Sequence, residues 1–117
     1  MKEFMLIFRM DLETAAAQPT QEQLDRYMAD WMQWIGSIAE RDLLADGGNH
    51  LAKTGCVLRK GSVHQSLYSA DHESVAGYIL IRSRDTAEAV EIASRCPILN
   101  GDGTSVEVRE LAAPGRA

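Results

Sequence analysis

Two stretches of the chain carry apolar residues on both faces of an extended strand. In residues 4–9 and in residues 75–82, apolar side chains occupy the odd and the even positions alike. Because the side chains of a strand point alternately to its two faces, both stretches are predicted strands buried on both sides. Residues 104–111 instead alternate Val106 and Val108 with polar residues. This pattern predicts a strand with one apolar face, as at the edge of a sheet.

Two segments have helical rather than strand periodicity. Thr20 and Gln23 match the capping box that opens a helix, and the predicted helix spans residues 21–43. Its apolar residues recur at the i, i+3, i+4, i+7 spacing of one helical face: Leu24, Tyr27, Met28, Trp31, Ile35 and Ile38. A second helix is predicted to begin at Asp85, with Glu88 completing a capping pattern, and to stop at Pro97.

Glycine-rich segments divide these elements. The run Asp46-Gly47-Gly48-Asn49 is typical of a turn, since glycine adopts positive φ without strain. Residues 55–59 and 62–67 read as two short strands of a hairpin joined at Lys60-Gly61. A last loop at residues 100–103 precedes the final strand.

The order strand, helix, strands, helix, strand predicts an α+β fold of the ferredoxin-like βαββαβ type with an extra hairpin strand. In that topology the two strands with two apolar faces are the central ones, and the final strand is an edge. Two helices cover only one face of such a sheet, so the apolar residues of the other face need a second cover. We therefore expect a homodimer.

Length and composition narrow the class further. The 117 residues fit one domain, 1–117, with a frayed tail at 112–117. A hydrophobic content of 45% excludes a disordered chain, and a net charge of −5 argues against a nucleic-acid partner. The apolar run at residues 4–8 is too short for a signal peptide or a membrane span. We expect a soluble cytoplasmic protein with no membrane partner.

The cysteines and histidines do not form a recognisable motif. Cys56 and Cys96 lie forty positions apart, and both are expected to be reduced, buried and unreactive. His50, His64 and His72 lack the spacing of a metal site. The glycine pair at 47–48 lacks the lysine and the spacing of a phosphate-binding loop. We expect no metal and no cofactor.

Several segments resemble the YCII-related proteins, and among them the branch called DGPF-domain proteins. The resemblance covers residues 1 to about 111, and it rests on the segments 1–9, 31–36, 47–49, 77–79, 88–93 and 96–99. It implies a dimeric α+β barrel in which two ferredoxin-like sheets pack face to face.

The motif that gives the branch its name is mostly lost. Its Asp-Gly-Pro-aromatic sequence falls on Gln65-Ser66-Leu67-Tyr68, where only the aromatic residue remains. Some YCII-related enzymes are thought to use a His and Asp pair with the histidine on the first helix, and the first helix here has no histidine. The resemblance therefore supplies no catalytic residue, and whether the protein is an enzyme stays open.

The remaining polar and aromatic residues give a candidate ligand pocket. We expect a small polar organic molecule in the cleft between the first helix and the sheet, lined by Trp31, Trp34, Asn49, His50, His64 and Tyr68. Strand alternation would place His64 and Tyr68 on one face, although an ordinary half-exposed edge strand gives the same pattern. Trp31 falls in the middle of the apolar stripe, as a core residue would.

An alternative function needs no ligand. Relatives in the DGPF branch are often encoded beside, or fused to, extracytoplasmic-function sigma factors. The resemblance therefore also implies a non-catalytic regulatory or accessory dimer that acts through protein contacts.

Overall fold

The computed structural model describes residues 1–115. It is an α+β structure with two α-helices, two short 3-10 helices and six strands. In chain order the elements are β1 (Lys2–Met10), η1 (Ala15–Ala17), α1 (Gln21–Glu40), β2 (Leu44–His50), β3 (Val57–Arg59), β4 (Ser62–His64), β5 (Ser74–Ser83), α2 (Thr86–Ala93), η2 (Pro97–Asn100) and β6 (Ser105–Glu110).

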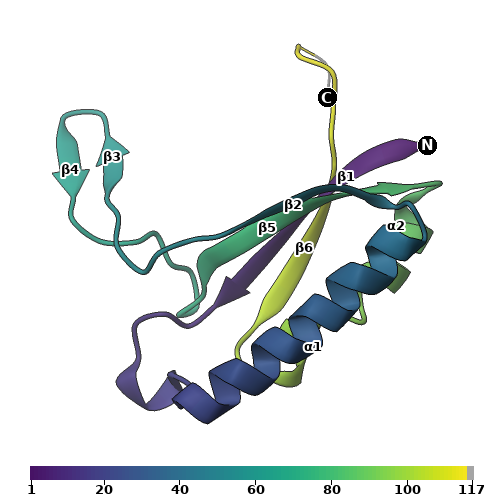
Figure 1. The fold of residues 1–117 in the computed structure, drawn as a ribbon. Coiled ribbons are helices and arrows are strands. Elements are labelled where there is room, and N and C mark those ends of the chain that lie inside the picture. The colour runs from purple at the N-terminus through teal and green to yellow at the C-terminus, as the bar shows by residue number, and fades with distance from the viewer. Residues whose placement is uncertain (116–117) are drawn as a thin grey trace.

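The main sheet is antiparallel and has the strand order β2-β5-β1-β6. β1 and β5 are central and β6 is an edge, as the apolar pattern predicts. Leu6 of β1 lies opposite Ile79 of β5 and Val108 of β6, which fixes the register of the inner strands. Both α-helices lie on one side of this sheet (Figure 1). The arrangement is compatible with a ferredoxin-like fold.

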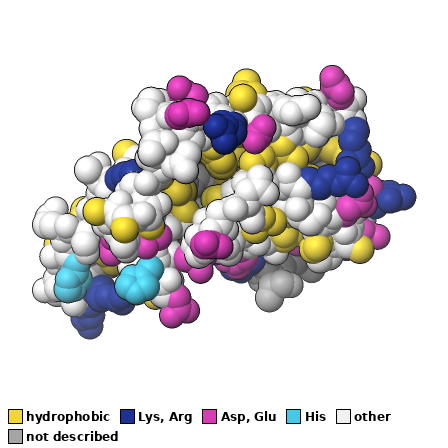
Figure 2. All heavy atoms as spheres, turned by 90° about the horizontal axis from the view of Figure 1, so that it is seen from below, with side chains coloured by type: hydrophobic (Ala, Val, Ile, Leu, Met, Phe, Trp, Pro, Cys, Tyr) yellow, Lys and Arg dark blue, Asp and Glu magenta, His cyan; other side chains and the backbone are white. Residues whose placement is uncertain are grey.

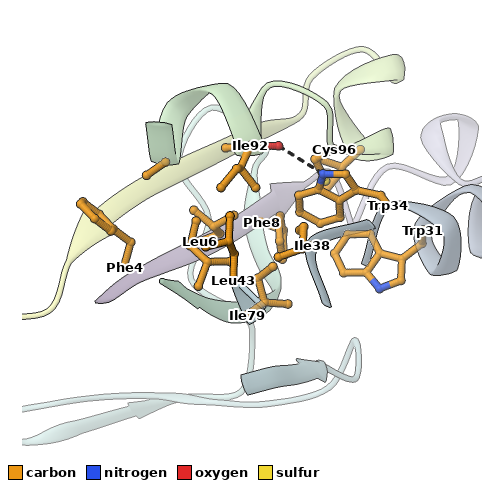
Figure 3. Close-up of a cluster of buried hydrophobic side chains, with 14 residues drawn as sticks. Phe4, Leu6, Phe8, Trp31, Trp34, Ile38, Leu43, Ile79, Ile92 and Cys96 are labelled. Carbon is orange, nitrogen blue, oxygen red and sulfur yellow. Dashed lines mark hydrogen bonds between the residues drawn. The ribbon is translucent and has the colours of Figure 1, made fainter. Parts of the chain in front are cut away.

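The hydrophobic core fills the space between the helices and the sheet. Figure 3 shows Phe8 of β1 facing Trp34 and Ile38 of α1, with Leu6 and Ile79 beside them. The ring of Phe8 meets those of Trp31 and Trp34 edge-on, with centroids 4.9 and 6.0 Å apart. The Trp34 indole N–H donates to the carbonyl oxygen of Ile92, 3.1 Å away, and so ties α1 to α2.

The first helix is shorter than the sequence predicts. It ends at Glu40, where the prediction extends it to residue 43. Asp42 takes a positive φ of 57°, and its N–H donates to Ala39 while the N–H of Leu43 donates to Ile38. This is a Schellman termination, in which buried Leu43 packs near Ile38. An aspartate in the left-handed region gives a weaker stop signal than glycine, so the periodicity conceals the end of the helix.

The predicted turn at 46–49 is wrong, because these residues belong to β2. The pairing of β2 with β5 shifts register between Leu44 and Asp46 and again between Asp46 and Asn49. Gly48 has a φ of 58° inside this irregular stretch. The glycine-containing segment therefore forms β-bulges in a strand and does not reverse the chain. The second sheet strand of the fold is therefore β2, whereas the sequence assigns that place to the hairpin.

The hairpin itself forms, but it lies apart from the main sheet. β3 and β4 make a two-stranded sheet with Leu58 opposite Val63, and they reverse at Lys60-Gly61 as predicted. Both strands are shorter than expected. Ser66 and Tyr68 lie beyond the end of β4, so strand alternation does not place them on a face with His64. We call residues 51–73 the arm; Figure 1 shows it projecting beyond the end of the sheet.

The face of the main sheet away from the helices carries apolar side chains. Met5 and Ile7 of β1 and Tyr78 and Leu80 of β5 are half-buried there, and they pair across the two strands as Met5 with Leu80 and Ile7 with Tyr78. We call these four residues the open face. The edge of the open face next to β6 is charged, and there Arg9 Nη1 lies 2.7 Å from Glu107 Oε1 in an ion pair.

The remaining expectations concern the ends and the solubility of the chain. Residues 112–115 follow the last strand, and residues 116–117 of the expected tail lie outside the described part of the chain. Within residues 1–115, neither helix has the length and apolar character needed to cross a bilayer.

Candidate functional site

A cavity of about 810 Å³ lies at the N-terminal half of α1. That size falls in the range of small-molecule sites, about 300–1,000 Å³. Its walls come from α1, the loop at residues 11–19, the end of β2 with the first residues of the arm, and the η2 region. Segments far apart in the sequence thus surround one space, and the cleft lies between the first helix and the sheet, where a ligand pocket is expected.

The apolar stripe of α1 changes role along the helix. Its C-terminal half packs in the core through Trp34 and Ile38. At the N-terminal half, Leu24 and Met28 are exposed and line the cavity. Figure 2, which views the molecule from the helix side, shows hydrophobic side chains (yellow) at the surface between the surrounding elements. Part of a stripe that reads as core in the sequence is therefore a cavity wall.

Three rings stand in sequence along this wall. The Tyr27 and Trp31 centroids are 5.9 Å apart at 35°, and the Trp31 and His50 centroids are 5.0 Å apart at 52°. We call Tyr27, Trp31 and His50 the aromatic row. Tyr27 and Trp31 lie one helical turn apart on α1, whereas His50 comes from the last position of β2.

The polar atoms of the aromatic row are free of hydrogen bonds to the described part of the protein. Within residues 1–115, the Tyr27 hydroxyl, the Trp31 indole N–H and the His50 imidazole form no hydrogen bond with another protein group. Trp34 differs, since its indole N–H donates a hydrogen bond to the carbonyl oxygen of Ile92. Burial, followed by the nearby Cys96, raises the pKa of the Tyr27 phenol well above its ordinary value of 10.0. The phenol is therefore neutral at physiological pH and able to donate a proton in a hydrogen bond.

The mouth of the cavity is braced by polar contacts. Lys53 Nζ of the arm donates to Gln18 Oε1 at 2.7 Å, and Gln18 Nε2 donates to the carbonyl oxygens of Asp11 and Thr14. The Asp11 carboxylate accepts from the backbone N–H groups of Thr14 and Glu13, which lowers its pKa, the Thr14 backbone bond most strongly. The loop at 11–19 is thus held against the base of the arm.

Charges of both signs line the cavity. The lining contains three carboxylates, of Asp11, Asp30 and Asp102, and two cations, Arg26 and Lys53. The lining therefore provides no concentrated field of one sign, which favours a polar ligand over a highly charged one. Among residues 1–115, no three His, Cys, Asp or Glu side chains gather as metal ligands.

The six residues expected at the pocket are divided among four places. Trp31 and His50 line the cavity together. Trp34 is in the core and borders a separate groove of about 300 Å³. Asn49 is exposed on β2 beside the cavity without lining it. His64 and Tyr68 are exposed on the arm, outside the cavity.

Three residues of the site are not predicted by the sequence pattern. The pattern places Tyr27 in the apolar stripe, although its position four residues before Trp31 puts the two rings next to each other on one helical face. Gln18 and Lys53 carry no local signal, since they meet across 35 positions of the chain.

The cysteines behave differently from each other. Cys96 is buried, and burial raises the pKa of its thiol to about 12, so it is unreactive as expected. Cys56 is exposed, and its expected burial is wrong. It precedes β3 on the arm, which has too little sheet around it to cover a side chain.

The chain matches none of the protein-family models and none of the curated proteins with which it was compared.

Proposed function

We propose that the protein binds a small polar organic molecule in the cavity between α1 and the sheet. The observation that carries this proposal is the aromatic row, in which the tilted rings of Tyr27, Trp31 and His50 follow one another along the cavity wall with their polar atoms unused by the fold. Ring faces bind planar groups, and a phenol, an indole N–H and an imidazole supply hydrogen bonds to fix their orientation.

The chemistry of the walls limits the ligand. Exposed Leu24 and Met28 favour a molecule with an apolar part, and the mixed charges favour one with little net charge. A planar ring or conjugated chain with hydroxyl, carbonyl or amide substituents fits both conditions. We assign binding and no reaction, because α1 has no histidine and Gln65 stands where the motif of the YCII-related branch has its Asp.

The test is a thermal-shift screen of small planar phenols, amides and hydroxy ketones, followed by calorimetric titration of the hits. For Tyr27→Phe and His50→Ala we expect the dissociation constant of a hit to rise by about tenfold, the effect of one lost hydrogen bond. Tyr68→Phe and His64→Ala are matched controls, because they make the same changes outside the cavity. If the controls weaken binding and the first pair does not, the site is on the arm and the proposal is wrong.

The proposal extends to the assembly that the resemblance implies. We propose a YCII-related homodimer in which the open faces of two copies pack together as a dimeric α+β barrel. Its support is the open face itself: Met5, Ile7, Tyr78 and Leu80 are adjacent apolar residues on the sheet side that no helix covers.

An accessory role through protein contacts is a second candidate. It is favoured by the exposure of Leu24, Met28 and Met32, which follow one another at intervals of four along α1 and would suit a partner helix. On the resemblance, that partner would be an extracytoplasmic-function sigma factor. A cavity that binds no compound of the screen, together with binding of such a factor that Met32→Asp abolishes, would favour this role over the first.

A further inference from the structure

Two apolar side chains of the arm are exposed to water. Leu58 and Val63 lie directly opposite each other in the pairing of β3 with β4, yet they are 70% and 55% exposed. Each strand has only three residues, and within residues 1–115 neither pairs with a strand of the main sheet. A two-stranded ribbon of this size is at best marginally stable alone. An additional surface is needed to cover it.

The arm projects on the side of the open face. Figure 1 shows it leaving the end of β2 and rising away from both helices. Any molecule that covers the open face therefore comes within reach of the arm. The open face and the arm thus both lie on the side of the sheet away from the helices.

The charge of the arm favours an acidic partner. The arm contains Lys53, Arg59 and Lys60, with Arg59 and Lys60 at the hairpin turn, and its two carboxylates, Asp71 and Glu73, lie at the opposite end, next to β5. The whole chain has 17 acidic residues against 12 basic ones. Most of this acidic excess lies outside the arm, so a second copy of the chain presents a surface of the complementary sign.

We propose that the arm of each protomer clasps a second copy of this chain, burying Leu58 and Val63 and directing Arg59 and Lys60 to its acidic surface. This inference rests on the proposed homodimer and adds a second contact to it. In a two-fold assembly the contact occurs twice, because the arm of each copy reaches the other. The arm then has the cover that the single chain does not provide.

The dissociation constant of the dimer tests the clasp. Sedimentation over a dilution series would compare the wild type with a Leu58→Gln, Val63→Thr double variant, which keeps side-chain size and strand preference. We expect the double variant to dimerise at least about tenfold more weakly. Met32→Gln removes an equally exposed apolar residue from α1 and is the matched control, with no change expected. An unchanged dissociation constant in the double variant overturns the clasp.

A face variant separates this inference from the dimer on which it rests. Leu80→Lys alters the open face and leaves the arm intact. If Leu80→Lys dissociates the protein and the arm variant does not, the dimer stands and the clasp is overturned. If the wild type is a monomer throughout, both are overturned.

Alkylation of Cys56 is a second measurement that requires no arm variant. Cys56 precedes β3 and is exposed in the single chain, whereas the other thiol, Cys96, is buried and silent. We expect its alkylation rate to fall several-fold as the wild-type concentration rises through the dissociation constant, and to be concentration-independent in Leu80→Lys. A rate that is fast at every concentration overturns the clasp. A rate that is slow in Leu80→Lys also overturns it, because the arm would then be covered by its own chain.

Discussion

Gly48 illustrates how one residue determines the path of an edge strand. Its φ is 58°, and a Cβ atom at this position would stand 1.7 Å from the backbone oxygen of Tyr78. At Gly47, the next residue back, an added Cβ would meet nothing within 4 Å. Only one glycine of the pair is therefore required by the close approach of β2 to β5.

Gly48→Ala should lower the free energy of unfolding by more than about 2 kcal/mol, because the added methyl group collides with backbone and the φ is unfavourable. Gly47→Ala is the control, with a change expected within about 1 kcal/mol. Urea unfolding of the two variants measures both. Equal losses would mean that β2 does not bulge at Gly48.

Single residues were predictable where the signal is local. The Thr20 capping box forms as expected, with Gln23 N–H donating to Thr20 Oγ1 and Thr20 N–H to Gln23 Oε1. His50 has no such signal, because the residue that it stacks on, Trp31, comes from another element. A cap depends on neighbours in the sequence and a site depends on neighbours in space, so the first can be read from the sequence and the second only in part.

At the scale of elements, α2 owes its start to a compact network. The Asp85 carboxylate accepts from the N–H of Glu88, and the Glu88 carboxylate accepts from the backbone N–H of Arg84, from its side chain and from Ser83 Oγ. The backbone bond from Arg84 is the largest cause of a lowered pKa at Glu88, and the Arg84 charge and the side-chain bonds add to it. The carboxylate form is thus the one that holds the helix start.

A lowered carboxyl pKa stabilises the fold above the ordinary value of 4.5, and this contribution disappears as the pH falls through the lower value in the folded protein. Glu88→Gln should therefore be less stable than the wild type near neutral pH, with the difference shrinking below about pH 4. Urea unfolding at a series of pH values measures it. Glu91→Gln, on the same helix in an exposed ion pair with Arg95, should differ little from the wild type at any pH. A Glu88→Gln difference that does not change with pH would contradict this account.

The elements that were predicted correctly have strong periodicity, and the errors have a common cause. β1 and β5 are identified by apolar residues on both faces, and α1 by its stripe. β2 was missed because its glycines and Asp46 read as a turn, although pairing with β5 holds them extended. Tertiary hydrogen bonds overcome weak local preference at an edge strand. Where the sequence pattern is weak, pairing with the neighbouring strand determines whether a segment is extended.

At the scale of the molecule, one sheet separates two surfaces with different proposed roles. The helix side holds the core and the cavity, and the opposite side holds the open face with the projecting arm. The need for a second cover on the sheet follows from the sequence alone, since it depends only on β1 and β5 being apolar on both faces. The separation of the arm from the main sheet does not follow from the sequence, because a hairpin pattern predicts the pairing of its two strands but not where the hairpin lies.

The open face gives the most direct test of the whole assembly. Leu80 is half-buried opposite Met5 on the open face, and a lysine there would bring an ammonium group into the proposed apolar interface. We expect wild type to sediment as a dimer and Leu80→Lys as a monomer at micromolar concentration. Met32→Lys places the same charge on exposed α1 and should leave the dimer intact. Far-ultraviolet circular dichroism would show whether Leu80→Lys keeps its fold, since the core on the helix side does not include Leu80. A folded Leu80→Lys protein that still dimerises with wild-type affinity would mean that the two copies do not meet through their sheets.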